Sequence, residues 1–333
     1  LGAGGMVASP NHLASADGAE RLAAGGNAVD AAVAVGVSLA VTLPRAGNLG
    51  GGGFMIIHDA ESGTDLAIDY REMAPRAATR DMYLDWKGDV DRSRATFSHL
   101  ASGVPGTVAG LFKAHTEFGR LPWKRVLQPA IQQAREGVTM SYDLAQLLRT
   151  RKERMCRDEA TCGYFYKPGG VPYEAGEVFK QEDLAASLER IAEDGPDGFY
   201  RGKTAQLIAA EMARGGGLVD ELSLAAYKPV VRTPVRGTYR GYEIVTMPPP
   251  SSGGIHIIQM LNILEHFPVA ELGAGSADNV HLLAEVARLA YADRSEHLGD
   301  PDYYDVPLDW LVSKEYAKEL AATIDMQKAR KSD

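Results

Sequence analysis

The sequence has no apolar stretch that is long enough to cross a lipid bilayer. Its longest apolar stretch, Ala31 to Pro44, has 14 uncharged residues, whereas a membrane-spanning helix needs about 20. We therefore expect this run to form a buried helix and predict no membrane span. A charged and then apolar leader is also missing before Gly2, so any export signal is expected to have been removed already.

Positive charge is scarce as well. The chain has 35 Lys and Arg against 44 Asp and Glu, which gives a net charge of −9. Nucleic acids and anionic membrane surfaces require a basic face on the protein, so neither is expected as a partner. With 333 residues, of which 45% are hydrophobic, the chain can still bury a large core.

The usual signatures of a self-contained catalytic centre are missing. Leu1 cannot be an amino-terminal nucleophile, because that role needs Thr, Ser or Cys. The sequence has no Gly-x-Ser-x-Gly motif, and its eight histidines form neither His-Glu-x-x-His nor a close pair with metal-ligand spacing. We expect no catalytic residue and no metal in this chain, and interpret it as a scaffold that holds a substrate while the catalytic atom lies elsewhere.

Cysteine is limited to Cys156 and Cys162. Two such ligands are too few for a zinc site. They flank a polar segment, residues 157–161, which we interpret as an exposed loop. Two interpretations stay open: a local disulfide, which an oxidising compartment would favour, or two unrelated surface thiols.

A run of four glycines, Gly50 to Gly53, is the most informative feature that is present. It separates an apolar helical pattern from an apolar strand pattern, and such a run marks a place where the backbone passes close to something else. Arg71 follows the next expected strand, and a guanidinium can hold a carboxylate through two hydrogen bonds. Together they predict a small, anionic substrate bound by Arg71.

Neighbouring residues are weaker candidates. Gly52 and Gly53 are candidates for lining the site, although tight packing of a helix against a strand is the favoured interpretation of the glycines. Glu72 is a candidate for orienting Arg71, and the alternative for Arg71 itself is a surface ion pair with Glu72 or Asp69.

Ser251 and Ser252 also belong to the candidate site-lining residues. They follow three prolines in Pro248 to Gly254, a rigid approach to a turn that caps the next helix. Neither serine is favoured as a nucleophile, because no histidine is placed beside them in the sequence. His99 is interpreted as a structural histidine.

No cofactor is expected. Gly198 to Thr204 resembles a phosphate-binding loop, but three residues rather than four separate its glycines, and the loop geometry depends on that spacing. The run Gly50 to Gly53 lacks the Gly-x-Gly-x-x-Gly order of a dinucleotide site.

Helical and strand patterns alternate along the chain, and no internal repeat or linker interrupts them, so we predict one domain over residues 1–333. Strand patterns occur at 52–58 and 66–70, which should form a hairpin, and at 236–247. Helical patterns occur at 15–24, 28–42, 105–118, 123–136, 141–154, 181–194, 204–214, 255–267 and 276–297.

Four segments in order resemble the γ-glutamyltranspeptidase family. They are Asn27 to Ala32, Gly47 to Phe54, Arg71 to Pro75, and Pro248 to Gly254. Four long motifs in register are far more specific than one glycine pattern. The resemblance covers the large, amino-terminal half of those enzymes.

The resemblance implies an α+β fold, the four-layer αββα sandwich of amino-terminal nucleophile hydrolases, completed by a second chain. In that family a precursor cleaves itself, and the new amino-terminal threonine of the small subunit is the nucleophile. The expected partners are thus the small subunit from the same precursor, in a heterodimer; γ-glutamyl substrates such as glutathione or glutamine; and amino-acid or peptide acceptors. Arg71 would bind the α-carboxylate of the substrate.

The family resemblance also implies a periplasmic or secreted protein, and export favours the Cys156–Cys162 disulfide. Two alternatives remain. The related glutaryl (cephalosporin) acylases share the architecture, although a glutaryl group lacks the α-amine of the zwitterion that a γ-glutamyl substrate presents. A secreted amino-acid-binding protein without catalysis would need two similar lobes and a hinge, and the sequence shows no such duplication.

Overall fold

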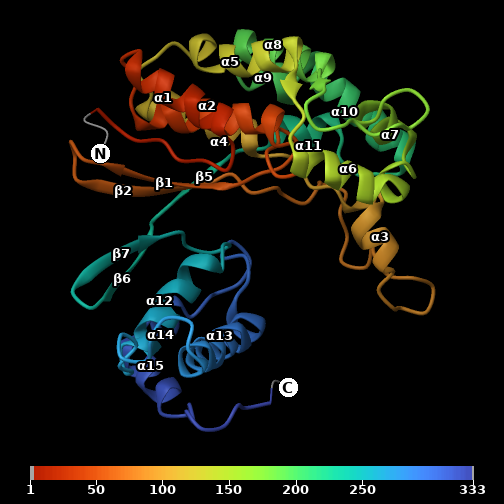
Figure 1. The fold of residues 1–333 in the computed structure, drawn as a ribbon. Coiled ribbons are helices and arrows are strands. Elements are labelled where there is room, and N and C mark those ends of the chain that lie inside the picture. Colours follow the sequence, from red (N-terminus) through yellow and green to blue (C-terminus); the bar gives the residue numbers. More distant parts are fainter. Residues whose placement is uncertain (1–3, 332–333) are drawn as a thin grey trace. The chain divides into compact units, whose positions relative to one another are not determined.

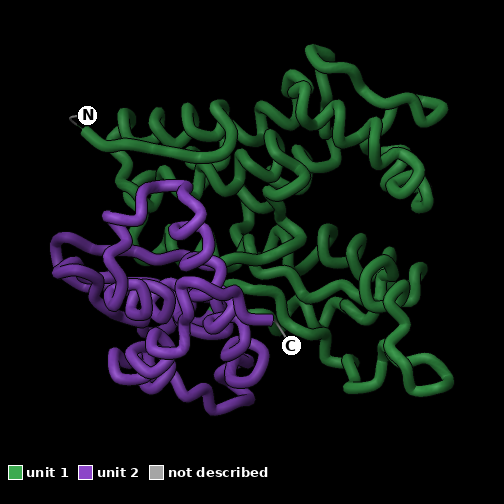
Figure 2. The backbone as a smooth tube through the Cα atoms, turned by 60° about the horizontal axis from the view of Figure 1, so that its bottom comes forward, with its two compact units in different colours: residues 1–53, 70–229 green, residues 54–69, 230–333 purple. Residues whose placement is uncertain are grey.

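The structure is a computed structural model that describes residues 4–331. Its contacts divide the chain into two compact units, and the chain alternates between them (Figure 2). Unit 1 comprises residues 1–53 and 70–229, and unit 2 comprises residues 54–69 and 230–333. The single domain expected over residues 1–333 stays a prediction.

Unit 1 is built on a pair of helices, α1 (His12–Ala23) and α2 (Ala28–Thr42), which pack along each other (Figure 1). Asn27 caps α2: its side chain accepts the N–H groups of Val29 and Asp30, and the Asp30 carboxylate accepts the N–H of Asn27. Together these hydrogen bonds form a capping box. Because α2 is apolar on nearly every side, it is buried against α1, α4 and α5.

Further helices extend unit 1 and bury their apolar faces against one another, as in the α5 and α8 pair. A small strand pair, β3 (Val138–Thr139) and β4 (Val178–Phe179), is antiparallel. The remaining elements of unit 1 are α3 (Arg92–Phe97), η1 (His99–Ala101), α4 (Thr107–Phe118), α5 (Trp123–Glu136), α6 (Tyr142–Met155), α7 (Glu159–Phe165), α8 (Glu182–Asp194), α9 (Asp197–Tyr200), α10 (Gly202–Gly215) and α11 (Glu221–Ala226).

Unit 2 contains a three-stranded antiparallel sheet in the order β1-β2-β5. Strands β1 (Phe54–Asp59) and β2 (Thr64–Asp69) form the expected hairpin, in a register that pairs Phe54 with Asp69 and Asp59 with Thr64. Strand β5 (Val230–Arg232) adds to the other edge of β2. The short length of β5 explains why the alternating pattern did not reveal it.

The strand expected over residues 236–247 is two strands. Strands β6 (Val235–Tyr239) and β7 (Tyr242–Thr246) pair antiparallel and form a hairpin. Arg240 and Gly241 make the turn with φ values of 48° and 87°, the left-handed backbone that tight hairpin turns require. Side chains alternate in the same way in both strands, so the alternating sequence pattern continues across the turn. The pattern alone therefore did not show where one strand ends and the next begins.

The helices of unit 2 enclose a separate core (Figure 1, teal to blue). They are α12 (Gly253–Leu264), α13 (Ala277–His297), α14 (Leu308–Leu311) and α15 (Lys314–Ala321). Ile263, Leu282 and Val286 are almost fully buried within this core. With helices beside antiparallel strands in both units, the chain is an α+β protein.

Candidate substrate-binding site

The backbone that carries Arg71 is fixed on both sides. Tyr70 and Gly53 exchange two backbone hydrogen bonds, of 3.0 and 3.2 Å, and Met73 and Val104 exchange two more, of 3.1 and 2.7 Å. Arg71 lies between these two pairs, and its side chain and that of Glu72 are exposed. The structure therefore presents Arg71 at the surface on a firmly held segment of backbone.

The glycine run is bound to the start of α4. The Gly51 carbonyl accepts the N–H groups of Gly106 at 2.7 Å and Thr107 at 3.1 Å. The Asn48 side-chain oxygen accepts the Gly51 N–H at 2.9 Å and the Thr107 hydroxyl at 2.6 Å. These bonds pair N–H groups at the start of α4 that have no partner within the helix. They also hold the glycine run, Gly50 to Gly53, beside residues 70–73.

Gly52 and Gly53 lie too close to this segment for any side chain. A Cβ on Gly52 would come 2.8 Å from the Glu72 nitrogen, and one on Gly53 would come 2.7 Å from the Tyr70 ring. This is the packing role that the sequence favours for the glycines.

Tyr70, the residue before Arg71, is buried. Its ring lies against α4 at Gly110, where a Cβ would come 2.1 Å from the ring. Burial raises the pKa of the Tyr70 phenol to about 12, because an apolar surrounding disfavours the charged form. Tyr70 is thus a neutral packing residue at neutral pH.

Sequence reasoning missed Asn48 and Tyr227, which both bind the backbone of this site. The Tyr227 hydroxyl donates a 2.8 Å hydrogen bond to the Arg71 carbonyl, across 156 positions of sequence. Asn48 lies inside the family-like segment Gly47 to Phe54, but nothing in the sequence singles out its side chain. Neither residue stands out by periodicity, since single polar side chains that bind distant backbone leave no repeating pattern.

Ser251 and Ser252 belong to unit 2, at the start of α12. The Ser251 hydroxyl accepts the Gly253 N–H at 3.3 Å, and the Ser252 hydroxyl accepts Nε of Arg294 at 3.2 Å. Among the described residues, neither hydroxyl is hydrogen-bonded to a histidine. The turn precedes the helix as expected, but α12 begins at Gly253 rather than at Ile255, and Ser252, at the N-cap position, makes no side-chain cap bond.

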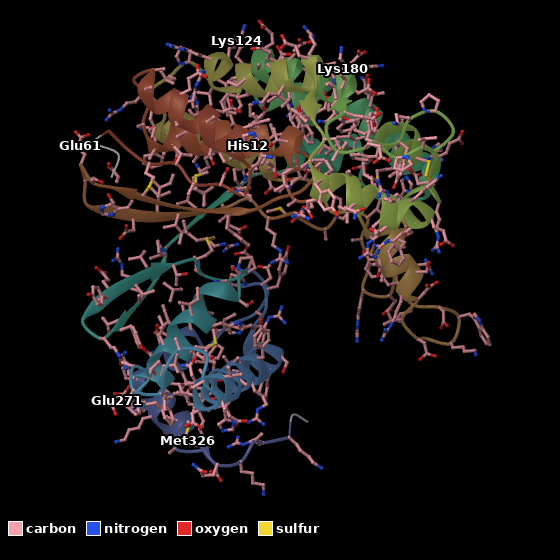
Figure 3. The ribbon with its side chains drawn as sticks, in the orientation of Figure 1. His12, Glu61, Lys124, Lys180, Glu271 and Met326 are labelled. Carbon is pink, nitrogen blue, oxygen red and sulfur yellow. A yellow bond between two sulfur atoms is a disulfide. The ribbon has the colours of Figure 1, made fainter. Side chains whose placement is uncertain are left out.

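Cys156 and Cys162 form a disulfide with an S–S distance of 2.04 Å (Figure 3, yellow). The segment between them is only partly a loop, which corrects the expectation for residues 157–161. Helix α7 begins at Glu159, and the Asp158 carboxylate caps it by accepting the Thr161 N–H at 2.7 Å. A short helix with a single polar turn gives little periodicity to detect.

His99 is hydrogen-bonded through Nε2 to the Glu211 carboxylate at 2.8 Å, and Glu211 also binds Arg214. This arrangement ties η1 to α10 within unit 1. Hydrogen bonds from Arg214 and His99 lower the pKa of Glu211 to about 2.

Two absences hold for residues 4–331, the part of the chain that the structure describes: a metal-binding cluster and a membrane-spanning helix. No cluster of three or more His, Cys, Asp or Glu side chains within this range is placed to hold a metal ion. Likewise, none of the helices in this part of the chain is long and apolar enough for a membrane crossing.

The chain was compared with known families, curated proteins and solved structures. A family model described as Gamma-glutamyltranspeptidase matches residues 14–333. The Glutathione hydrolase proenzyme of Escherichia coli (strain K12) is 53% identical over 329 residues, which cover 98% of this chain and 56% of that protein. The crystal structure of Helicobacter pylori gamma-glutamyltranspeptidase aligns with a TM-score of 0.97 and 43% identity, covering 100% of this chain and 95% of that chain.

The Acylase ACY 1 proenzyme of Pseudomonas sp. (strain SE83) is 42% identical, over 99% of this chain and 60% of that protein. The chain therefore spans little more than half the length of these curated relatives. The structural match confirms the predicted α+β fold of the amino-terminal nucleophile hydrolase type. The chain belongs to the γ-glutamyltranspeptidase family.

Proposed function

We propose that this chain is the large subunit of a γ-glutamyltranspeptidase, and that Arg71 binds the α-carboxylate of the γ-glutamyl substrate. The observation that carries the proposal is the exposed Arg71 on backbone that Gly53 and Val104 hold in place. A guanidinium held in this way can recognise a carboxylate through two hydrogen bonds. The names of relatives at 53% identity and of a structure at 43% identity support the same activity.

The reaction would be divided between two chains. The amino-terminal threonine of the small subunit, produced from the same precursor, would attack the γ-amide carbonyl carbon through its hydroxyl oxygen. The C–N bond then breaks, the amine leaves with a proton, and the γ-glutamyl group remains as an ester. Water, or the amine of an amino acid or peptide, displaces the threonine and completes hydrolysis or transfer.

Within this scheme Arg71 contributes position rather than bond-making. Binding the α-carboxylate places the γ-carbonyl at a fixed distance from the nucleophile, which lowers the entropic part of the barrier. Glutathione and glutamine both present the required γ-glutamyl group. A periplasmic or secreted location agrees with the disulfide between Cys156 and Cys162.

An acylase acting on glutaryl amides is the second candidate, because a relative at 42% identity bears the name of an acylase. A glutaryl group has a carboxylate at the position of the γ-glutamyl α-carboxylate, which Arg71 can also hold, but it lacks the α-amine of the γ-glutamyl group. The two candidates therefore differ in one measurable property, the preference between γ-glutamyl and glutaryl anilides that are otherwise alike.

The test uses the complete proenzyme, with its maturation followed by intact mass. We expect two polypeptides, the second starting with threonine, and release of the chromogenic amine from a γ-glutamyl anilide. Arg71→Ala should lower kcat/KM roughly 100-fold, as expected for the loss of about 3 kcal/mol of charge-assisted hydrogen bonding. Arg76→Ala is the matched control, because Arg76 is exposed on the same segment.

Two results would contradict the proposal. One is a single inactive chain. The other is an active enzyme in which Arg71→Ala and Arg76→Ala behave alike, or which prefers the glutaryl anilide.

A further inference from the structure

We infer that Tyr227 is a positioning residue for Arg71, and that its hydroxyl sets the affinity of the site for the substrate carboxylate. The inference rests on the proposed function, since it concerns the same arginine. It starts from the 2.8 Å hydrogen bond that the Tyr227 hydroxyl donates to the Arg71 carbonyl.

Tyr227 is itself fixed. It ends α11, is 8% exposed, and stacks on Tyr200 with ring centroids 5.7 Å apart and an angle of 5° between the rings. The Tyr200 hydroxyl donates to the Pro105 carbonyl at 2.9 Å and accepts the Ala109 N–H at 3.3 Å. A buried and stacked ring loses little further freedom when its hydroxyl makes a bond, so Tyr227 is a rigid donor.

The absence of a side chain at position 106 gives the Tyr227 hydroxyl access to the Arg71 carbonyl. A Cβ on Gly106 would come 2.1 Å from the Tyr227 hydroxyl oxygen and 2.0 Å from the Tyr70 carbonyl oxygen. Glycine at position 106 therefore lets the hydroxyl reach the segment that carries Arg71. A backbone approach of this kind requires glycine for steric reasons.

The bond acts at the peptide unit that follows the Arg71 Cα. The pairs at Tyr70 and Met73 hold the segment one residue before and two residues after Arg71, and Tyr227 fixes the carbonyl between them. A guanidinium at the end of a long side chain amplifies small rotations of its own backbone. Loss of the hydroxyl should thus spread the guanidinium over more positions and weaken carboxylate binding, without touching the acyl-transfer step.

The test compares two tyrosines in the mature two-chain enzyme. Tyr227→Phe removes the donor and keeps the ring. Tyr166→Phe is the matched control, because the Tyr166 hydroxyl is also buried and donates to a backbone carbonyl, that of Leu148, at 2.7 Å. We expect Tyr227→Phe to raise KM for a γ-glutamyl anilide about tenfold with kcat within about twofold of the wild type, and Tyr166→Phe to change neither.

A second measurement separates positioning from general damage. In the Arg71→Ala background Tyr227→Phe should have no further effect on KM, and a 4-aminobutyryl anilide, which lacks the α-carboxylate, should react equally with the wild type and with Tyr227→Phe. Such non-additivity is the mark of residues that act as a unit.

Several results would overturn the inference. An unchanged KM in Tyr227→Phe would do so, as would an equal rise in Tyr166→Phe or a Tyr227→Phe proenzyme that does not mature while Tyr166→Phe does. These outcomes leave the proposed function standing as long as the wild type cleaves the γ-glutamyl anilide. A wild type without that activity overturns the proposed function and this inference together.

Discussion

Gly52 lies directly against the backbone of Tyr70. A Cβ on Gly52 would come 2.5 Å from the Tyr70 carbonyl oxygen, and that oxygen accepts the N–H of the adjacent Gly53. Atoms of a paired backbone cannot move aside as a flexible side chain can. The approach of the glycine run to the Arg71 segment therefore depends on the absence of a side chain at position 52.

Gly52→Ala should destabilise the protein and displace Arg71. We expect a loss of about 2–3 kcal/mol in the free energy of unfolding, at the upper end of overpacking costs because backbone must shift, together with a raised KM for the γ-glutamyl anilide. Denaturant unfolding and steady-state kinetics of the mature enzyme measure the two effects.

Gly50→Ala is the control for this substitution. Gly50 belongs to the same run, is exposed, and has no atom within 4 Å of the position of a Cβ. Its replacement should change the free energy of unfolding by less than about 0.5 kcal/mol. Equal free energies of unfolding for the two variants would show that the backbone around Gly52 accommodates a Cβ without loss of stability.

The capping box of α2 shows how far the sequence can predict this fold. Asn27 and Asp30 are three residues apart, so their mutual hydrogen bonds follow from local sequence, and the helical pattern predicted the limits of α2 at residues 28 and 42. The same Asp30 carboxylate also accepts the N–H groups of Arg120 at 3.0 and 3.2 Å and of Leu121 at 3.2 Å. Those bonds span about ninety positions, and no local pattern encodes them.

The residues of the candidate site also differ in whether the sequence singles them out. The sequence singles out Arg71 and its glycines as candidates because their residue types are rare in such an arrangement and match a family pattern, and their role in substrate binding stays a prediction. Tyr227 and Asn48 are not singled out, since a tyrosine or asparagine that binds distant backbone resembles any other until the chain has folded. Short elements such as β5 and α7 were missed because three to seven residues carry too little periodicity.

The pKa of Glu211 predicts a pH dependence of stability in unit 1. Hydrogen bonds from Arg214 and His99 lower this pKa from 4.5 to about 2 in the folded chain. A carboxyl whose pKa is lower in the folded state contributes stability that is complete above its unfolded pKa, and this contribution is lost as the pH falls toward the folded pKa.

Glu211→Gln should therefore lower the unfolding midpoint at pH 7, and the difference from the wild type should shrink between pH 5 and pH 3. Denaturant midpoints measured across this range give the result directly. A difference that stays constant with pH would show that the charge of Glu211 contributes nothing and that the amide loses stability for another reason.

Arg232 in unit 2 provides a prediction that is independent of the substrate site. Its Nε donates to Asp69 at 2.8 Å, and its two terminal nitrogens bind both oxygens of Asp302 at 3.0 and 2.8 Å. The side chain of Arg232 is 14% exposed and that of Asp69 is 7% exposed. Both carboxylates raise the pKa of Arg232, so the guanidinium stays charged.

Arg232→Lys should destabilise unit 2 although it keeps the charge. A lysine ammonium cannot bind Asp302 through two parallel bonds and Asp69 through a third, so the buried Asp69 carboxylate would lose its hydrogen bond from Arg232 at a cost of roughly 2–3 kcal/mol. The bonds to the half-exposed Asp302 should matter less, because solvent screens them.

Arg236→Lys is the matched control on the next strand along the chain, β6, where the arginine is 48% exposed and pairs with Asp65 and Glu243. It should cost less than about 1 kcal/mol. Hydrogen exchange of the β2 and β5 amides, measured with denaturant unfolding, assigns any loss to this sheet. If the two lysine variants unfold alike, the burial of Asp69 does not govern the stability of the sheet, and the charge of Arg232 alone is enough.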